Sequence, residues 1–214
     1  MISYGDLALK VARLLSDPDN STYSEELIWD GVVSALDAVM PYIPQFAFDT
    51  LTAGSGGDVF QLPDDLYAIQ AVRVKESGVY LPKATMAPSS VKSSAEEDND
   101  WLDYPTGYLS LSVALDEGDE LELFYFSYWP KPATETDLTF QITVPDVAYE
   151  GLMLYAASHC LMSRAVSAAN IRQFNLREDS GNPEHNPIKE MGEAYRHLFY
   201  QEMKTMPPYT RVGL

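Results

Sequence analysis

The chain has 214 residues, enough for one domain with a full core or for two small ones. A hydrophobic fraction of 46 %, with fourteen Tyr, eight Phe and three Trp, supplies apolar surface for a core and excludes global disorder. The 32 acidic and 14 basic side chains give a formal net charge of −18, which argues against wrapping nucleic acid or docking on an anionic membrane, because both need Lys and Arg.

Two helices are predicted within residues 1–44. The first is indicated by four apolar residues at helical spacing: Leu7, Val11, Leu14 and Leu15. Turn-forming residues at 17–20 end it. Thr22 and Glu25 have the spacing of a capping box that starts the second helix. The apolar stripe of this helix consists of Ile28, Val32, Ala35, Leu36, Val39 and Ile43, and Pro41 and Pro44 end it.

Residues 45–144 are predicted to be rich in β-strands. Phe46 and Phe48 alternate with Ala and Asp neighbours, as in a strand. Residues 68–74 and 79–81 are predicted as two strands joined by a tight turn.

The clearest β pattern lies at residues 109–126. Apolar residues alternate along 109–115, a turn rich in Asp and Gly follows, and 121–126 returns with apolar residues on both faces near its end. We expect these two segments to form the central hairpin of a sheet. Before them, the small and polar residues of 85–103 predict an exposed excursion.

Residues 145–204 are predicted to form two further helices. One begins after Pro145, and Pro187 occupies a position typical of the first residue of the other. The order of elements predicts an α+β fold: an antiparallel four-helix bundle of two N-terminal and two C-terminal helices, with an inserted antiparallel β domain. The expected parts are a helical hairpin at 1–44, the β insertion at 45–144, a second helical hairpin at 145–204 and an extended tail at 205–214.

The sequence predicts no catalytic residue, no cofactor and no metal site. Metalloprotease, paired-cysteine and P-loop motifs are missing, and the glycine-rich run at 54–57 leads into a strand instead of a helix. The single cysteine, Cys160, excludes an internal disulfide and fits a reducing cytosol. Because adjacent helical residues point in different directions, we interpret Cys160 as a core thiol and His159 as a half-buried polar residue, not as a shared site. His185 is expected in a loop and His197 on a helix surface.

The acidic run at 96–100 could hold a hard cation only if the chain curled, and we interpret it as a solvated loop. Two other sets of acidic residues are candidates for chemistry. Asp17, Asp19 and Ser21 resemble the start of a calcium loop. An EF-hand then requires Gly and Glu where this chain has Thr22 and Ile28, so we interpret the run as helix punctuation.

The second set consists of Glu120, Glu122 and Glu150, which could provide the carboxylate pair of a glycosidase. Strand alternation places Glu120 and Glu122 on one face, and we interpret that face as solvated.

Several segments together carry a family resemblance. They are a capped acidic helix start at 22–29 with its end at Met40 and Pro41, a Leu-Pro-Asp turn at 60–66 followed by a strand at 69–74, a strand pair at 104–108 and 119–125, and a helix entry at 145–152. In this order they resemble the head-to-tail connectors of tailed bacteriophages, of the adaptor type, from about residue 2 to residue 204. The excursion at 85–103 and the C-terminal tail are not covered.

The resemblance implies a structural protein of the virion neck, at the portal vertex, assembled in the host cytoplasm. Adaptors of this kind form a ring, usually of twelve subunits, beneath the portal protein. The ring extends the DNA channel and anchors a tail or nozzle protein. No reaction, cofactor or membrane is implied. Because an acidic wall repels phosphates, DNA is expected to pass without tight binding.

The C-terminal tail is the predicted contact with other chains. An extended segment can become ordered in a groove of a partner, so we expect residues 203–214 to insert into the portal ring or between neighbouring subunits. The residues assigned to this contact are Met203, Met206, Pro207, Pro208, Tyr209, Thr210, Arg211, Val212 and Leu214.

Two other interpretations stay open. A carbohydrate-binding or glycosidase module would place aromatic residues such as Trp101, Tyr128 and Trp129 along an exposed groove. Another phage neck component, a stopper or tail terminator, would be smaller and dominated by β-structure, so the four predicted helices count against it.

Overall fold

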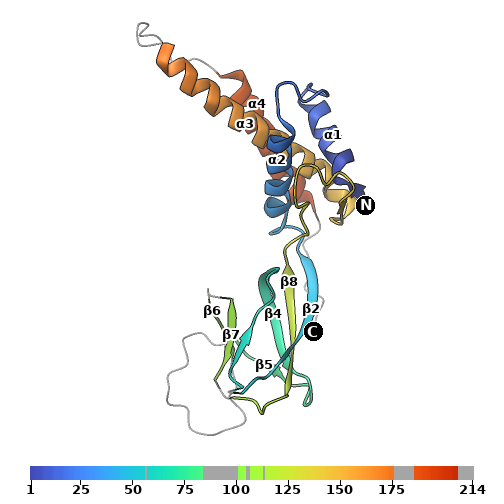
Figure 1. Ribbon diagram of the computed structural model, residues 1–214, viewed down its shortest axis with the longest axis vertical. Coiled ribbons are helices and arrows are strands. Elements are labelled where there is room, and N and C mark those ends of the chain that lie inside the picture. The colour runs from blue at the N-terminus through green and yellow to red at the C-terminus, as the bar shows by residue number, and fades with distance from the viewer. Residues whose placement is uncertain (56, 84–100, 105–106, 113, 176–185, 207–214) are drawn as a thin grey trace. The chain divides into compact units, whose positions relative to one another are not determined.

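The chain has a mixed α+β fold, as the sequence predicts, and its described residues contain four α-helices and several antiparallel sheets (Figure 1). The computed structural model describes residues 1–55, 57–83, 101–104, 107–112, 114–175 and 186–206, and for 101–104 and 167–175 it describes the backbone alone. The chain divides into a helical unit, Met1–Pro44 with Trp129–Leu214, and a β unit, Gln45–Tyr128. Residues 129–144, which the sequence pattern groups with the β segments, therefore belong to the helical unit.

Helix α3 is the centre of the helical unit, because it packs against each of the other three helices. The helices are α1 (Tyr4–Leu14), α2 (Glu25–Val39), α3 (Tyr149–Asn175) and α4 (Pro187–Thr205), with a 3-10 turn, η1 (Asp146–Ala148), before α3. Strand β1 (Ile2–Ser3) pairs with β9 (Gln141–Ile142). The largest fully buried side chains of this unit are Tyr4, Leu7, Ile28, Leu36, Met40, Ile142, Leu152, Phe199 and Met203. None of the helices in the described ranges has an apolar stretch that could span a bilayer.

The start of α2 differs from the prediction. Ser24 is the N-cap, and its hydroxyl accepts a hydrogen bond from the Leu27 amide at 3.2 Å. The capping box predicted at Thr22 is therefore wrong. Thr22 belongs instead to the turn before α2, where its amide donates a hydrogen bond to the carboxylate of Asp17. The start of α4 is confirmed: Pro187 is its first residue, and the side chain of Asn186 caps it.

The β unit contains two antiparallel sheets. The four-stranded sheet has the order β2 (Gln45–Thr52), β8 (Glu120–Ser127), β4 (Leu66–Val74) and β5 (Tyr80–Leu81). The three-stranded sheet has the order β3 (Val59–Gln61), β7 (Tyr108–Leu111) and β6 (Trp101–Tyr104). Both sheets contribute to one hydrophobic core, which includes Leu51, Phe60, Val72, Leu109, Leu111, Leu121 and Leu123.

Two predictions for the β unit need correction. The central hairpin predicted at 109–126 does not form, because β7 pairs with β3 and β6 while β8 pairs with β2 and β4. The apolar residues of β7 and β8 meet in the core from different sheets. Of the excursion predicted at 85–103, residues 85–100 lie outside the described residues, but 101–103 belong to strand β6. The tight turn between β4 and β5 is confirmed, with Gly78 at a φ of 69°.

Candidate functional site

Strand β8 presents two faces of different character. Leu121, Leu123 and Tyr125 are buried in the core, whereas the alternate residues are only partly buried. Cross-strand pairing extends this second face across the sheet. We call it the open face, and it consists of Phe46, Phe48, Thr50 and Thr52 on β2, Glu120, Glu122, Phe124 and Phe126 on β8, Ala68, Ala71 and Arg73 on β4, and Tyr80 on β5.

Aromatic side chains gather on one half of the open face. Phe46 lies opposite Phe126, and Phe48 lies opposite Phe124. The side chains of Phe46 and Phe48 are 57 % and 52 % exposed. The rings of Phe48 and Phe124 have centroids 5.2 Å apart, and those of Tyr80 and Phe124 are 6.2 Å apart. On β4, the residues opposite Phe126 and Phe124 are the small residues Ala68 and Ala71.

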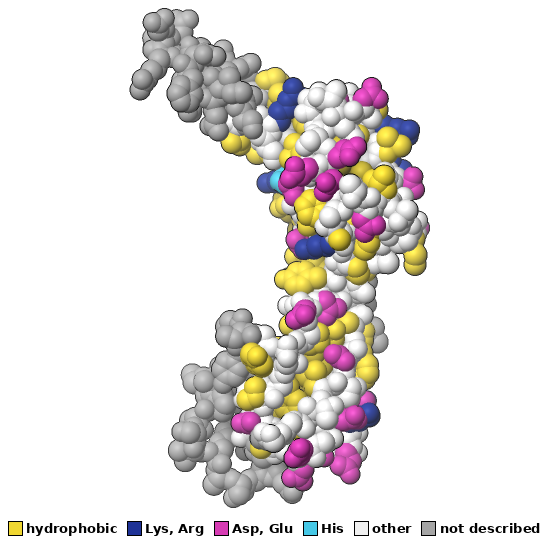
Figure 2. Space-filling view, viewed as in Figure 1, with side chains coloured by type: hydrophobic (Ala, Val, Ile, Leu, Met, Phe, Trp, Pro, Cys, Tyr) yellow, Lys and Arg dark blue, Asp and Glu magenta, His cyan; other side chains and the backbone are white. Residues whose placement is uncertain are grey.

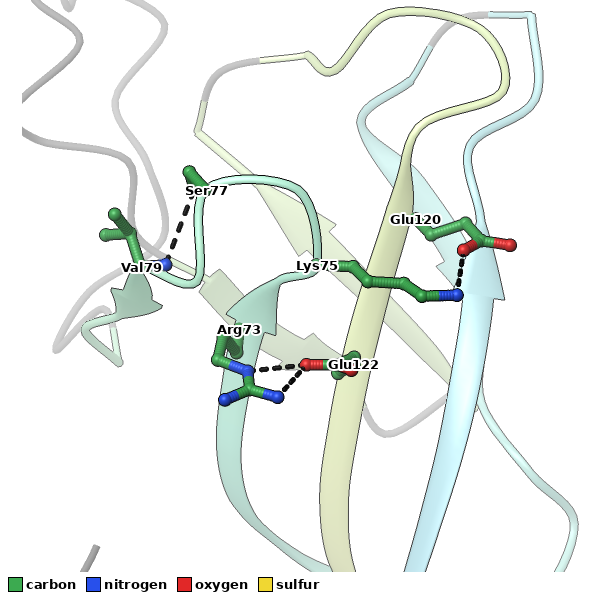
Figure 3. Close-up of polar contacts among 6 residues, drawn as sticks. All are labelled: Arg73, Lys75, Ser77, Val79, Glu120 and Glu122. Carbon is green, nitrogen blue, oxygen red and sulfur yellow. Dashed lines mark hydrogen bonds and ion pairs between the residues drawn. The ribbon is translucent and has the colours of Figure 1, made fainter.

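The other half of the open face carries two ion pairs (Figure 3). Arg73 on β4 donates to Glu122 on β8, and Lys75, just beyond β4, donates to Glu120. The Arg73 guanidinium also lies 5.5 Å from the ring centroids of both Tyr80 and Phe124. Hydrogen bonds to the glutamates raise the pKa of both Arg73 and Lys75. The charges of Glu120, Glu122 and Arg73 on the open face and that of Lys75 beside it therefore cancel, in a chain whose net charge is −18.

This arrangement gives no support to the glycosidase interpretation of the acidic residues. That mechanism needs one carboxyl that can donate a proton and a second placed across a cleft. Glu120 and Glu122 instead both accept hydrogen bonds from cations on a sheet face. Glu150 lies on α3 and so belongs to the other unit.

The histidine and the cysteine of α3 have no visible role in chemistry. The Cys160 thiol is fully buried, and burial raises its pKa to about 12, so it stays protonated. Burial first, and then the charge of Arg196, lower the pKa of the half-buried His159. His197 lies on the exposed surface of α4, as predicted, and His185 lies outside the described residues. Within the described ranges, no group of three or more His, Cys, Asp or Glu side chains could hold a metal ion.

Asp17 organises the turn between α1 and α2. Its two carboxylate oxygens accept hydrogen bonds from the Ser21 amide at 3.1 Å, the Ser21 hydroxyl at 2.7 Å and the Thr22 and Tyr23 amides, both at 2.8 Å. The oxygens are thus occupied by donors of the chain itself. This geometry supports helix punctuation over calcium binding.

Asp17→Asn is expected to make the free energy of unfolding less sensitive to a fall in pH. The hydrogen bonds, that from the Ser21 hydroxyl first, hold the pKa of Asp17 below its usual value. Such a carboxylate stabilises the fold above the unfolded-state pKa of about 3.9, and this contribution is lost as the pH falls from there through the folded-state pKa. The difference in urea midpoint between wild type and variant should therefore be constant near neutral pH and shrink below about pH 4.

Asp19→Asn is the matched control for this measurement. Asp19 is exposed and two residues away in the same turn. We expect its substitution to leave the pH profile of the urea midpoint unchanged. A profile like that of Asp17→Asn would contradict the role given to the Asp17 carboxylate.

The predicted tail contact is only partly within the described residues. Met203 is fully buried in the core of the helical unit, where its methyl group lies against Gly151. Its side chain is therefore a packing residue of α4 and not part of an extended tail. Met206 is the C-cap of α4 and is partly buried against the same core, whereas residues 207–214 lie outside the described residues.

The aromatic residues named for a carbohydrate groove lie in separate environments. Trp129 is buried in the helical unit, and its indole nitrogen donates to the Ile43 carbonyl at 2.8 Å. Tyr128 is exposed and packs edge-on against Tyr67, with ring centroids 5.4 Å apart. Of Trp101 only the backbone is described, in β6. The burial of Trp129 removes one of the residues that such a groove would need.

The open face as a set was missed by sequence reasoning. The alternation at Phe46 and Phe48 and the apolar end of 121–126 were both visible in the sequence. Their proximity was not, because it depends on β2 (Gln45–Thr52) pairing with β8 (Glu120–Ser127), which is far away in the sequence. The feature that indicates it is the apolar character of both faces of 121–126. A strand with one solvated face would have polar residues on that face.

The chain matches no protein-family model, and no curated protein is significantly similar to it.

Proposed function

We propose that this chain is a structural virion protein, a head-to-tail adaptor that forms a ring beneath the portal of a tailed bacteriophage. The observation that carries the proposal is the open face. It exposes large aromatic side chains together on a sheet, which is typical of a surface that contacts another protein. Its ionic groups are paired with one another, so it offers a surface for assembly instead of reactive groups.

The arrangement of the helices and the position of the β unit in the chain also support this proposal. In our proposal the four helices form an antiparallel bundle, and the β unit is an insertion between α2 and α3. The packing of α3 against the other three helices supports a bundle, and the unit boundaries at Gln45 and Tyr128 support an insertion. This order of elements is the one that the resemblance to adaptors implies, and the four helices count against a stopper or tail terminator.

The charge distribution supports a DNA conduit. Residues 1–145 contain 24 acidic and 7 basic side chains, whereas residues 146–214 contain 8 and 7. A channel wall with this excess of carboxylates repels phosphates, so DNA passes without being held. In our proposal the partners are further copies of the chain, the portal protein and a tail or nozzle protein, and the site of action is the virion neck.

Electron microscopy of the purified protein, with and without a portal ring, tests the proposal. We expect a closed annulus on the portal, of about twelve subunits, the number that the resemblance to adaptors implies. A protein that stays unbound to the portal overturns the proposal.

A truncated variant separates the tail from the rest of the chain. Removing residues 207–214 leaves α4 and the core residue Met203 in place. If the tail inserts into the portal ring, this variant binds the portal more weakly than the full chain in the same images. Equal occupancy of the portal by both proteins contradicts the predicted tail contact.

A further inference from the structure

We infer that the open face is a surface through which copies of this chain contact one another. The inference rests on the proposed ring, in which one contact, between two complementary surfaces of neighbouring subunits, is repeated at every subunit boundary. The open face is one of these two surfaces. The inference adds the location of that surface and the residues that form it. Figure 2 shows hydrophobic side chains gathered on the visible side of the β unit, with acidic side chains around them.

The first argument is the amount of exposed aromatic surface. An aromatic side chain has roughly 200 Å² of surface, so Phe46 and Phe48, each more than half exposed, leave roughly 200 Å² in water. Tyr80, at 43 % exposed, and the partly buried Phe124 and Phe126 enlarge this area. The total is in the range of about 300–600 Å² that is typical of the largest, often functional, patch on a monomer.

The second argument is charge, and it identifies the occupant. Two copies of a chain with a net charge of −18 repel each other over most of their surface. On the open face this repulsion is removed, because Arg73 neutralises Glu122 and Lys75 neutralises Glu120. A basic partner would gain nothing from this neutral face and would prefer the acidic surface elsewhere. A second copy of the same acidic chain is the partner for which local neutrality matters.

The third argument is the position of β2 at the edge of the sheet. Its partner in the four-stranded sheet is β8, and no other strand among the described residues pairs with its second edge along Gln45–Thr52. An open edge can pair with a strand of another chain, and Phe46 and Phe48 stand on the face beside it. A neighbouring copy can therefore gain main-chain hydrogen bonds and bury aromatic rings in one contact.

The chemistry of the open face is unsuited to a glycan. Sugar-binding platforms combine stacking rings with polar side chains that are available to hydroxyl groups. Here the charged side chains next to the rings already bind one another, and the remaining neighbours are Ala68, Ala71, Thr50 and Thr52. A contact between protein surfaces requires no such polar groups at its centre.

The test compares two variants in sedimentation velocity over a range of protein concentrations. Phe46→Thr/Phe48→Thr removes the most exposed rings and keeps residues that favour strands. Val59→Thr is the matched control, because Val59 is 55 % exposed on β3 in the other sheet of the same unit. We expect the double variant to raise the dissociation constant of self-association at least about tenfold, and Val59→Thr to leave it unchanged. Equal urea midpoints exclude misfolding as the cause.

A thiol probe gives a second, independent measurement. Cys160 is fully buried, so a cysteine introduced at the exposed Thr52 reacts alone with iodoacetamide. We expect Thr52→Cys to react several-fold more slowly at concentrations where the protein is associated. Thr139→Cys, on the exposed surface of the helical unit, is the control and should react at a constant rate.

The outcomes separate the inference from the adaptor proposal. A wild-type chain that stays monomeric up to its solubility limit overturns the inference, as does self-association that the double variant leaves unchanged. If wild type and double variant form the same annulus on a portal ring, the open face is not the contact but the adaptor proposal stands. If the open face mediates self-association and no portal is bound, the adaptor proposal fails and the inference stands.

Discussion

Phe199→Ala is expected to lower the free energy of unfolding of the helical unit by about 3–5 kcal/mol. The Phe199 side chain on α4 is fully buried. Its ring centroid lies 4.9 Å from that of Tyr155 on α3 and 6.2 Å from that of Tyr42, both in edge-on geometry. Truncation removes the transfer free energy of the ring and leaves a cavity between α3 and α4 that these large neighbours cannot fill.

Leu198→Ala provides the matched control for this experiment. Leu198 precedes Phe199 on the same helix and is 45 % exposed, so its truncation should change stability by no more than about 0.5 kcal/mol. Urea unfolding followed by far-ultraviolet circular dichroism at 222 nm, where helices dominate the signal, measures both variants. Equal losses for the two substitutions would contradict the packing described for Phe199.

The second large effect is expected for Gly31→Ala, at the contact between α2 and α3. A Cβ atom at Gly31 would lie 2.9 Å from the Ala156 carbonyl oxygen and 3.3 Å from the Ala156 Cα. Because both are backbone atoms, the helices must move apart, and such overpacking costs about 1–3 kcal/mol or more. On an exposed helix the same substitution would stabilise by about 1 kcal/mol. A decrease in the free energy of unfolding on Gly31→Ala therefore indicates a close approach of α2 and α3, and an increase indicates that there is room for the Cβ atom.

Gly151→Ala is the comparison for Gly31→Ala. A Cβ atom at Gly151, on α3, would meet the terminal methyl of Met203 at 2.5 Å. That methyl ends a flexible side chain, which can turn away, so we expect a smaller loss than at Gly31. Urea midpoints of the two variants give the comparison. A Gly31→Ala variant more stable than wild type would contradict the close contact at Ala156.

The helices show which features periodicity alone can predict. The stripe predicted on α2 is the face that packs in the core, since Ile28, Val32 and Ala35 are all buried. The beginning of the same helix was misplaced, because Thr22 and Ser24 both have hydroxyls suited to capping. Only the folded turn shows that the Thr22 amide is bound to Asp17 and that Ser24 is left as the cap.

The β unit shows what alternation of apolar residues cannot predict, namely which strands pair. The alternation of β7 and β8 determined which side chains are buried, and Leu109, Leu111, Leu121 and Leu123 all lie in the core. Alternation does not identify the neighbouring strand, because two strands of a hairpin and two strands in facing sheets bury their apolar residues in the same pattern. The predicted hairpin failed for this reason. The same reason concealed the open face, which forms only where β2 meets β8.

Local periodicity and composition are enough to predict the mixed α+β class, the helical segments near both ends, the β-rich middle and the excess of acidic residues in 1–145. The pairing of distant segments is needed to know that Arg73 and Lys75 neutralise Glu122 and Glu120, and that Phe46 and Phe48 share a face with Phe124. The burial of Trp129 likewise becomes known only from the folded chain. Each of these depends on which distant segments pair, and that is set by packing of the whole unit.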